Sequence, residues 1–159
     1  GLFYNLSLTA EDRKKKDMYK QQVKRETVKK KFTDIEDYLA EMELKMTIYK
    51  NDETIIPRMS QMSQKTNQFN LTTKRYTESD IEQFIENNNS NVYAFSVSDR
   101  FGDSGITGLC IINFHNETQF AEIDTLLISC RIIGRNIEYA IIDFIRIWVV
   151  YCMNFIINT

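Results

Sequence analysis

The stretch LLISCRIIGRNIE, residues 126–138, joins an apolar strand pattern to an apolar helix pattern through a short turn. The turn carries Arg131 and Arg135 on either side of Gly134. A chain that leaves a strand here and restarts as a helix exposes unpaired backbone N–H groups at the helix N-terminus, where partial positive charge favours an anion. We therefore expect this turn to hold a phosphate group.

The composition of the whole chain predicts an ordinary globular fold. With 159 residues, of which 43% are hydrophobic and 26% are charged, the chain is long enough to bury one core. The formal net charge of -2 and the pI of about 5.5 give no electrostatic reason to expect nucleic acid as a partner.

The cysteines and the apolar runs indicate where the protein is found. Cys110, Cys130 and Cys152 lack metal-ligand spacing, so no metal site is expected, and their odd number suits reduced thiols in the cytoplasm. The first residues show no basic segment followed by an apolar run, so we expect no export signal. The longest apolar stretch, 137–159, contains charged residues and is interpreted as a buried helix, with no membrane contact.

Composition divides the chain near residue 42. Residues 1–41 form a charged helical lead, with Thr9 as the expected N-cap of a long helix and Thr33 with Glu36 as a capping box for a short one. The long helix has only a thin apolar stripe, made of Met18, Tyr19, Val23 and Val28. Both a solvated connecting helix and a functional basic surface fit this pattern.

Residues 42–159 have the pattern of an α+β domain. A strand is expected at 42–50, and a short helix capped by Thr77 further on. Between them, the stretch 52–69 spaces Ile56, Met59, Met62 and Ser63 like one face of a helix, with Pro57 in its first turn. Three strands follow at 92–99, 106–114 and 119–129, and their short connections predict an antiparallel meander. A helix from Arg135 to Val150, apolar on most of its surface, should lie across this sheet.

Two levels of resemblance follow from these residues. The order strand, helix, helix, three-strand meander, Arg-x-x-Gly turn and helix resembles the Gcn5-related N-acetyltransferase fold, a mixed sheet whose corresponding turn binds the pyrophosphate of coenzyme A. The blocks QKTNQFNLTTKRYT (64–77), SDRFGDSG (98–105) and SCRIIGRNIE (129–138) together resemble the C-terminal domain of FkbH-like proteins.

The FkbH-like resemblance implies a function in acyl transfer. Such proteins are similar to enzymes that move a glyceryl group in methoxymalonyl-carrier biosynthesis, with an acyl carrier protein as partner and coenzyme A or carrier-linked phosphopantetheine as cofactor. Their haloacid dehalogenase-type domain uses an Asp-x-Asp motif, which this sequence lacks, so that domain is expected as a partner in the same or another chain. The chain then acts as an acyltransferase, as a docking domain for the carrier's arm, or as an oligomerisation domain.

This sequence departs from the resembling family in two places. Asn136 stands where the family's turn has glycine, and its side chain would crowd a pyrophosphate. Only about twenty residues follow the turn, so we expect a sheet cut short after one further strand at MNFIIN, 153–158. The apolar run after Val149 consists of Val150, Tyr151, Met153, Phe155, Ile156 and Ile157. We expect a homodimer to cover it, with the N-terminal helix folding back as the alternative.

The phosphate site is assigned to Arg131, Gly134, Arg135 and Asn136, and the alternative for the arginines is a salt bridge to Glu138 or Asp124. Cys130 lies beside them, in surroundings that activate a thiol as a nucleophile; alternatively it is a small buried residue that closes the strand.

Two carboxylates are the candidate general bases. Glu122 and Asp124 alternate along one strand, so they share a face of the sheet. His115 lies in the polar turn FHNETQ and is expected to be exposed at a hairpin tip, which makes it a weaker candidate.

Substrate contacts are assigned to polar residues in the first two blocks. The polar wall for an acyl group or a pantetheine amide consists of Asn67, Gln68, Asn70, Thr72 and Thr73. The alternative for this segment is a helix C-terminus followed by a turn. Arg100 is a candidate for gripping the carrier's phosphate, although Gly102 and Gly105 explain its surroundings as a tight chain reversal.

Overall fold

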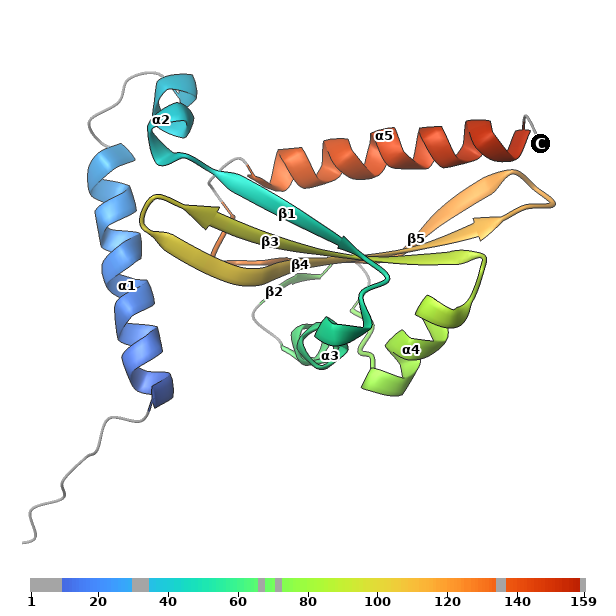
Figure 1. Cartoon of the computed structure of the whole chain (residues 1–159), viewed down its shortest axis with the longest axis horizontal. Coiled ribbons are helices and arrows are strands. Elements are labelled where there is room, and N and C mark those ends of the chain that lie inside the picture. Colours follow the sequence, from blue (N-terminus) through green and yellow to red (C-terminus); the bar gives the residue numbers. More distant parts are fainter. Residues whose placement is uncertain (1–9, 30–34, 66–67, 71–72, 134–136, 158–159) are drawn as a thin grey trace, which may run out of the picture. The chain divides into compact units, whose positions relative to one another are not determined.

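The computed structural model describes residues 10–29, 35–65, 68–70, 73–133 and 137–157. Its elements, shown in Figure 1, are α1 (Ala10–Lys29), α2 (Ile35–Met42), β1 (Lys45–Lys50), the 3-10 helix η1 (Glu53–Ile55), α3 (Ile56–Gln64), β2 (Gln68–Asn70), α4 (Glu78–Glu86), β3 (Ser90–Asp99), β4 (Gly102–His115), β5 (Phe120–Ser129) and α5 (Ile137–Ile157). The fold is α+β, as predicted.

The chain divides into two compact units. The first, which we call the α1 unit, comprises Gly1–Lys45 and Ser98–Asp103; the second, the sheet unit, comprises Met46–Val97 and Ser104–Thr159. Composition predicted a boundary near residue 42, and it did not predict that the turn between β3 and β4 belongs with the N-terminal helices.

Within the described residues the strands form one sheet in the order β1-β3-β4-β5-β2. Neighbouring strands run antiparallel (Figure 1), so the expectation of a mixed sheet is wrong. The three-strand meander β3-β4-β5 is confirmed. The unexpected element is β2, whose three residues pair with the end of β5, from Gln68 opposite Ser129 to Asn70 opposite Leu127. The end of β5 is therefore paired with β2 at this edge of the sheet.

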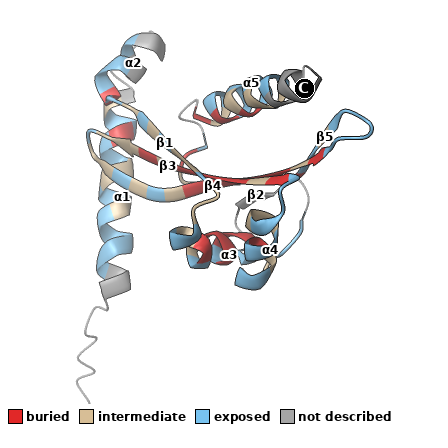
Figure 2. Ribbon diagram, turned by 45° about the vertical axis from the view of Figure 1, so that its right-hand side comes forward, coloured by how far each residue is buried: buried red, intermediate tan, exposed pale blue. Residues whose placement is uncertain are grey.

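In the sheet unit, helices cover both faces of the sheet. Figure 1 shows α3 and α4 on one face and α5 on the other. Figure 2 shows the buried residues concentrated in the central strands and on the side of α3 that faces them. The core between α3, α4 and the sheet consists of Ile56, Met59, Ile81, Val92, Ala94, Leu109, Ile111 and Leu127. Each of its large apolar side chains stabilises the fold by about 1.5–3 kcal/mol.

Local signals in the sequence set the starts of α3 and α4. Pro57 occupies the first turn of α3, where its missing N–H costs no hydrogen bond. Thr77 caps α4: its side chain accepts from the backbone N–H of Asp80, and the Asp80 carboxylate accepts from the backbone N–H of Thr77. Both helices begin where the sequence predicts.

The last helix runs further than predicted. α5 extends to Ile157, so the strand expected at MNFIIN is wrong for the residues up to 157. One side of the helix is held by an aromatic cluster in which Tyr93 and Phe95 of β3 meet Phe144 edge-on, with ring centroids 5.7 and 5.9 Å away. Trp148 joins the cluster, 6.2 Å from Tyr93.

The α1 unit is held by a buried ion pair. Arg25 of α1 donates from Nε and one terminal nitrogen to the two carboxylate oxygens of Asp99, over 2.5 and 2.9 Å. The two side chains are only 5% and 0% exposed. At Gly102 an added Cβ would lie 2.6 Å from the side-chain amide of Gln21, which shows how closely α1 approaches the β3-β4 turn. The charged helix is therefore anchored to this turn through Arg25.

None of the helices in the described ranges combines the length and the apolar character of a transmembrane span.

Candidate functional site

The predicted anion site begins in the turn that follows β5. The backbone N–H groups of Arg131 and Ile132 both donate to Ser129, to its Oγ at 3.4 Å and to its carbonyl oxygen at 3.1 Å. Ile132 is fully buried and fixes the turn to the core, which leaves Cys130 exposed and Arg131 half-buried. Gly134, Arg135 and Asn136 lie outside the described residues, and α5 begins at Ile137.

Arg58, in the first turn of α3, is a second cation at this place. Its guanidinium donates to the side-chain oxygen of Gln61 and, over 3.5 Å, to the carbonyl oxygen of Ile106. The β4-β5 register pairs Gly108 with Ile128, and continuing it by two residues sets Ile106 opposite Cys130. Arg58 and Arg131 therefore lie at the same end of the β4-β5 pair.

The charge of Arg131 acts on Arg58, as expected for two guanidinium groups at the same end of the β4-β5 pair. Burial lowers the pKa of Arg58, and the positive charge of Arg131 lowers it further. We call Arg58 and Arg131 the arginine pair. One feature of the sequence pointed to a special role for Arg58. A cation in the first turn of a helix is opposed by the helix dipole, so another contact has to stabilise it there.

Cys130 is next to the arginine pair and is exposed. Its interpretation as a small buried residue is therefore wrong, and its role as a nucleophile stays a prediction. Cys110, by contrast, is fully buried, and burial raises the pKa of its thiol to about 12, so it is inert as a nucleophile.

A bulge in β5 shapes the surroundings of Asp124. Ile111 pairs with Thr125 while Ile112 pairs with Ile123, so Asp124 is the extra residue. The bulge brings Thr125 to the same side as Asp124, and the Thr125 hydroxyl donates to Asp124 Oδ2 over 2.9 Å.

Three side chains converge on the Asp124 carboxylate, and we call them with it the Asp124 network. Besides Thr125, Lys74 Nζ donates to Oδ1 over 2.7 Å, and the Tyr76 hydroxyl donates to Oδ2. Burial acts to raise the pKa of Asp124, but the hydrogen bonds from Lys74, Tyr76 and Thr125 outweigh it and leave the pKa below its usual value. An ionised carboxylate with three donors is a poor general base, so this predicted role is not supported.

The Asp124 network also raises the pKa values of Tyr76 and Lys74. Burial is the larger cause that raises the pKa of Tyr76, and the hydrogen bond to Asp124 raises it further, so its hydroxyl stays protonated. The hydrogen bond to Asp124 raises the pKa of Lys74. The salt bridge of Asp124 is formed with Lys74, whereas the sequence considered Arg131 as its partner. Lys74 and Tyr76 lie in the block KRYT, whose polar pattern gave no sign of this pairing.

Glu122 and His115 lie together at the far end of the β4-β5 hairpin. His115 Nε2 is 3.3 Å from Glu122 Oε2, and both side chains are half exposed. The exposed position of His115 is confirmed. The charge of Glu122 also acts on Lys74, as expected for a carboxylate on the same face as Asp124.

The predicted polar wall is only partly described. Asn67 and Thr72 lie outside the described residues, as do the side chains of Gln68 and Asn70. The backbone of Gln68 and Asn70 belongs to β2, so the alternative of a helix C-terminus and turn is wrong at these positions. Thr73 is exposed and adopts a positive φ of 54°, a conformation that is uncommon outside glycine.

Arg100 belongs to the α1 unit, and its contacts there differ from the predicted phosphate grip. Its guanidinium pairs with Glu41 and lies 4.8 Å from the ring centroid of Phe101, while its backbone N–H donates to the carbonyl oxygen of Met42 over 3.0 Å. These contacts give Arg100 a structural function within its own unit.

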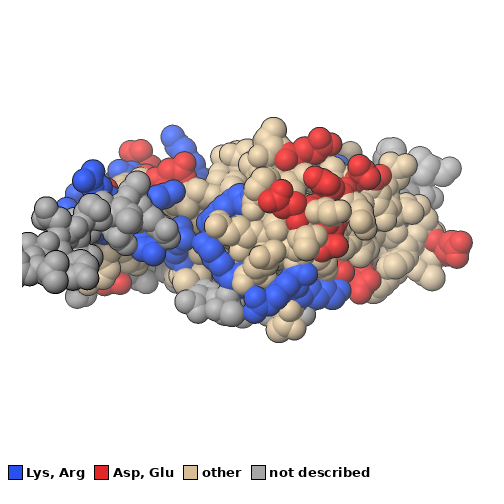
Figure 3. Space-filling model, turned by 90° about the horizontal axis from the view of Figure 1, so that it is seen from below, with Lys and Arg blue, Asp and Glu red and all other residues tan. Residues whose placement is uncertain are grey.

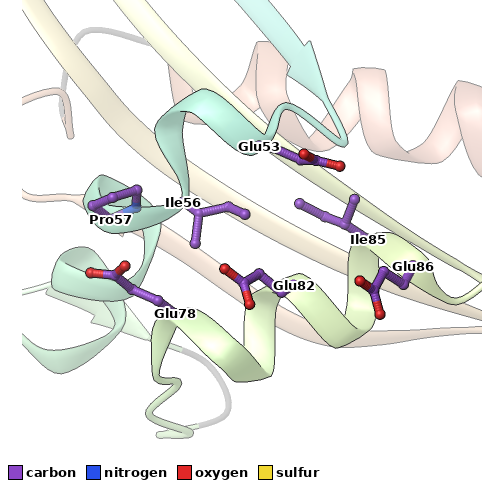
Figure 4. A pocket seen from close by; sticks show the side chains of 7 residues that line it. All are labelled: Glu53, Ile56, Pro57, Glu78, Glu82, Ile85 and Glu86. Atoms are coloured by element: carbon purple, nitrogen blue, oxygen red, sulfur yellow. The ribbon is translucent and has the colours of Figure 1, made fainter.

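A groove of about 320 Å³ lies between the start of α3 and α4. Figure 4 shows Glu78, Glu82 and Glu86 along α4, facing Ile56 and Pro57. In Figure 3 acidic side chains gather on this face of the sheet unit. The lining residues are Glu53, Ile56, Pro57, Glu78, Glu82, Ile85 and Glu86. Four carboxylates repel a phosphate, so the groove cannot be the anion site.

Within the described ranges, no three side chains of His, Cys, Asp or Glu are placed to share a metal ion. Comparisons of the chain with protein-family models, with curated proteins and with solved structures gave no match. The arginine pair therefore has to be interpreted from its own chemistry.

Proposed function

We propose that the chain binds the phosphate of a phosphopantetheine arm at the arginine pair, either on an acyl carrier protein or in coenzyme A. In this proposal it is the acyltransferase-like, GNAT-like part of an FkbH-like protein, and it presents the arm for transfer of a glyceryl or related acyl group. The observation that carries the proposal is the position of Arg58 beside Arg131 at the end of the β4-β5 pair.

The chemistry of two neighbouring guanidinium groups favours a phosphate ligand. Each guanidinium offers planar N–H donors that match phosphate oxygens, and a charge-assisted hydrogen bond of this kind is worth about 1.5–3 kcal/mol. Two like charges near one another in a half-buried place repel, and after burial, which is the larger cause, the charge of Arg131 contributes to the lowered pKa of Arg58. A dianionic phosphate between them would turn that repulsion into attraction.

Binding is better supported than catalysis by this chain alone. The candidate base Asp124 is buried and already accepts the hydrogen bonds of the Asp124 network, and Glu122 is exposed at the hairpin end. Exposed Cys130 beside the arginine pair is the remaining candidate nucleophile. The haloacid dehalogenase-type domain that the family resemblance implies would then supply the missing chemistry.

Titration with coenzyme A tests the anion site. We expect coenzyme A and free phosphopantetheine to shift the backbone amide resonances of Gly134 and Arg135. Arg58→Ala and Arg131→Ala should each weaken binding about tenfold or more, because each removes one charge-assisted contact.

Arg13→Ala is the matched control, since it removes an exposed arginine of α1 and should leave the affinity unchanged. Equal titration of all three variants and the unmodified chain would rule out the arginine pair as the site.

Incubation of the chain with a holo-carrier and an acyl donor tests catalysis. We expect no acyl transfer above background in mass spectra of the carrier, because the candidate base is held in the Asp124 network. Transfer that disappears in Cys130→Ser would instead make this chain the catalyst.

A further inference from the structure

The side of α5 that points away from the sheet carries large apolar residues. Tyr139, Ile142, Ile147 and Val150 are 65%, 49%, 64% and 55% exposed. Asp143 and Arg146 lie among them, 65% and 74% exposed. We call these six residues the outer face of α5. Ile141 and Ile145 on the opposite side are buried, so the helix is already packed on the sheet side and has a second apolar side left over.

The outer face of α5 is symmetric about its middle. Tyr139 and Val150, Ile142 and Ile147, and Asp143 and Arg146 are each equidistant along the chain from the point between Phe144 and Ile145. Successive residues of an α-helix are rotated by about 100° about its axis. The two members of each pair therefore lie at equal and opposite angles from one line drawn along the helix surface. In the first two pairs an apolar residue is thus related to another apolar residue, and in the third pair Asp143 is related to Arg146.

We propose that a second copy of this chain docks on the outer face of α5, with the two helices antiparallel across a two-fold axis near Phe144 and Ile145. A two-fold interface uses the same patch on both copies, so residue i meets residue j and residue j meets residue i. The symmetry of the outer face meets this requirement for all three pairs.

Charge complementarity argues for this occupant in particular. Within one helix, Asp143 Oδ1 and Arg146 lie 3.7 Å apart, a loose pair between two exposed side chains. Across the axis, Asp143 of each copy meets Arg146 of the other, so the two copies form a ring of four alternating charges. A parallel arrangement of the helices would set Asp143 near Asp143 and is disfavoured.

The apolar pairs bury nonpolar surface between the two copies, which the charged ring does not. Tyr139 would pack on Val150 of the second copy, and Ile142 on Ile147, above and below the charged ring. One face of one helix is small for a stable dimer, for which about 800 Å² per partner is usual. We therefore expect a reversible dimer with a dissociation constant in the micromolar range, on the order of 1–100 μM.

Charge reversal tests the interface without disturbing the core, since both residues are exposed. By sedimentation equilibrium, the unmodified chain should show a mass of twice 18.8 kDa at high micromolar concentration. Asp143→Arg and Arg146→Asp should each weaken the dimer more than about tenfold, because each sets two like-charge pairs in the interface. Ile147→Glu should give a monomer.

The decisive sample is a mixture of the two single variants. Asp143→Arg and Arg146→Asp carry complementary faces, so their mixture should regain the dimer mass, as should the double variant. A monomer in the unmodified chain would overturn the proposal. So would a dimer that none of these substitutions weakens, because that dimer would use another surface, such as the end of α5 after Val150.

Discussion

Replacing Arg25 by methionine lowers the free energy of unfolding of the α1 unit by about 3–5 kcal/mol, because it leaves the carboxylate of Asp99 buried without its ionic partner. This is the largest effect that we expect from any single substitution in the described structure. Hydrogen exchange of the amides in α1, together with urea unfolding followed by circular dichroism, measures it.

Three variants separate the buried pair from a general effect of charge. Arg25→Lys should lose less, since an ammonium group keeps the charge but not the two-point contact with Asp99. The double variant Arg25→Met with Asp99→Leu should recover part of the loss, because no buried charge remains. Arg13→Met, at an exposed position of the same helix, should stay within about 0.5 kcal/mol. An equal loss in Arg13→Met and Arg25→Met would contradict the anchor.

Asp124→Asn destabilises the sheet unit by about 2 kcal/mol at neutral pH, because it removes the charge from a carboxylate that accepts three hydrogen bonds. The exposed substitution Glu122→Gln is the control and should change stability by less than about 0.5 kcal/mol. Urea unfolding followed by Trp148 fluorescence compares the two.

The pH dependence of Asp124→Asn distinguishes the charge from the shape of the side chain. Because the pKa of Asp124 in the folded chain lies below its ordinary value of 3.8, its stabilisation is fully present above that pH. The stabilisation is lost as the pH falls through the folded pKa. The gap between the unmodified chain and Asp124→Asn should therefore narrow below pH 3.8, and a gap that stays constant into acid would show that the network does not depend on charge.

Elements with local signals could be predicted from the sequence. The capping box at Thr77, Pro57 in the first turn of α3, and the strand periodicity of β3, β4 and β5 each act within a few residues of the chain. The same holds for the turn at Arg131, where a strand pattern changes to a helix pattern. Short-range hydrogen bonds and backbone sterics decide these features, so they are visible in a short window of sequence.

Features that depend on distant partners could not be predicted in this way. The three residues of β2 have no strand periodicity, and they form a strand only because the end of β5 offers unpaired backbone groups. The helix α5 passes its expected end, and its inner side packs against Tyr93 and Phe95 of β3. Arg25 and Asp99, 74 residues apart, look like ordinary surface charges until the fold buries them together.

The candidate site divides along the same line. The sequence by itself determined that Cys130 and Arg131 follow the end of one strand and that Asp124 lies within that strand, because chain order alone sets these positions. Only the tertiary structure set Arg58 beside Arg131, and only it brought Lys74 and Tyr76, 50 and 48 residues away, onto Asp124. The physical reason is that burial and neighbouring charge decide whether a carboxylate acts as a base or as an anchor, and both are properties of the packed fold.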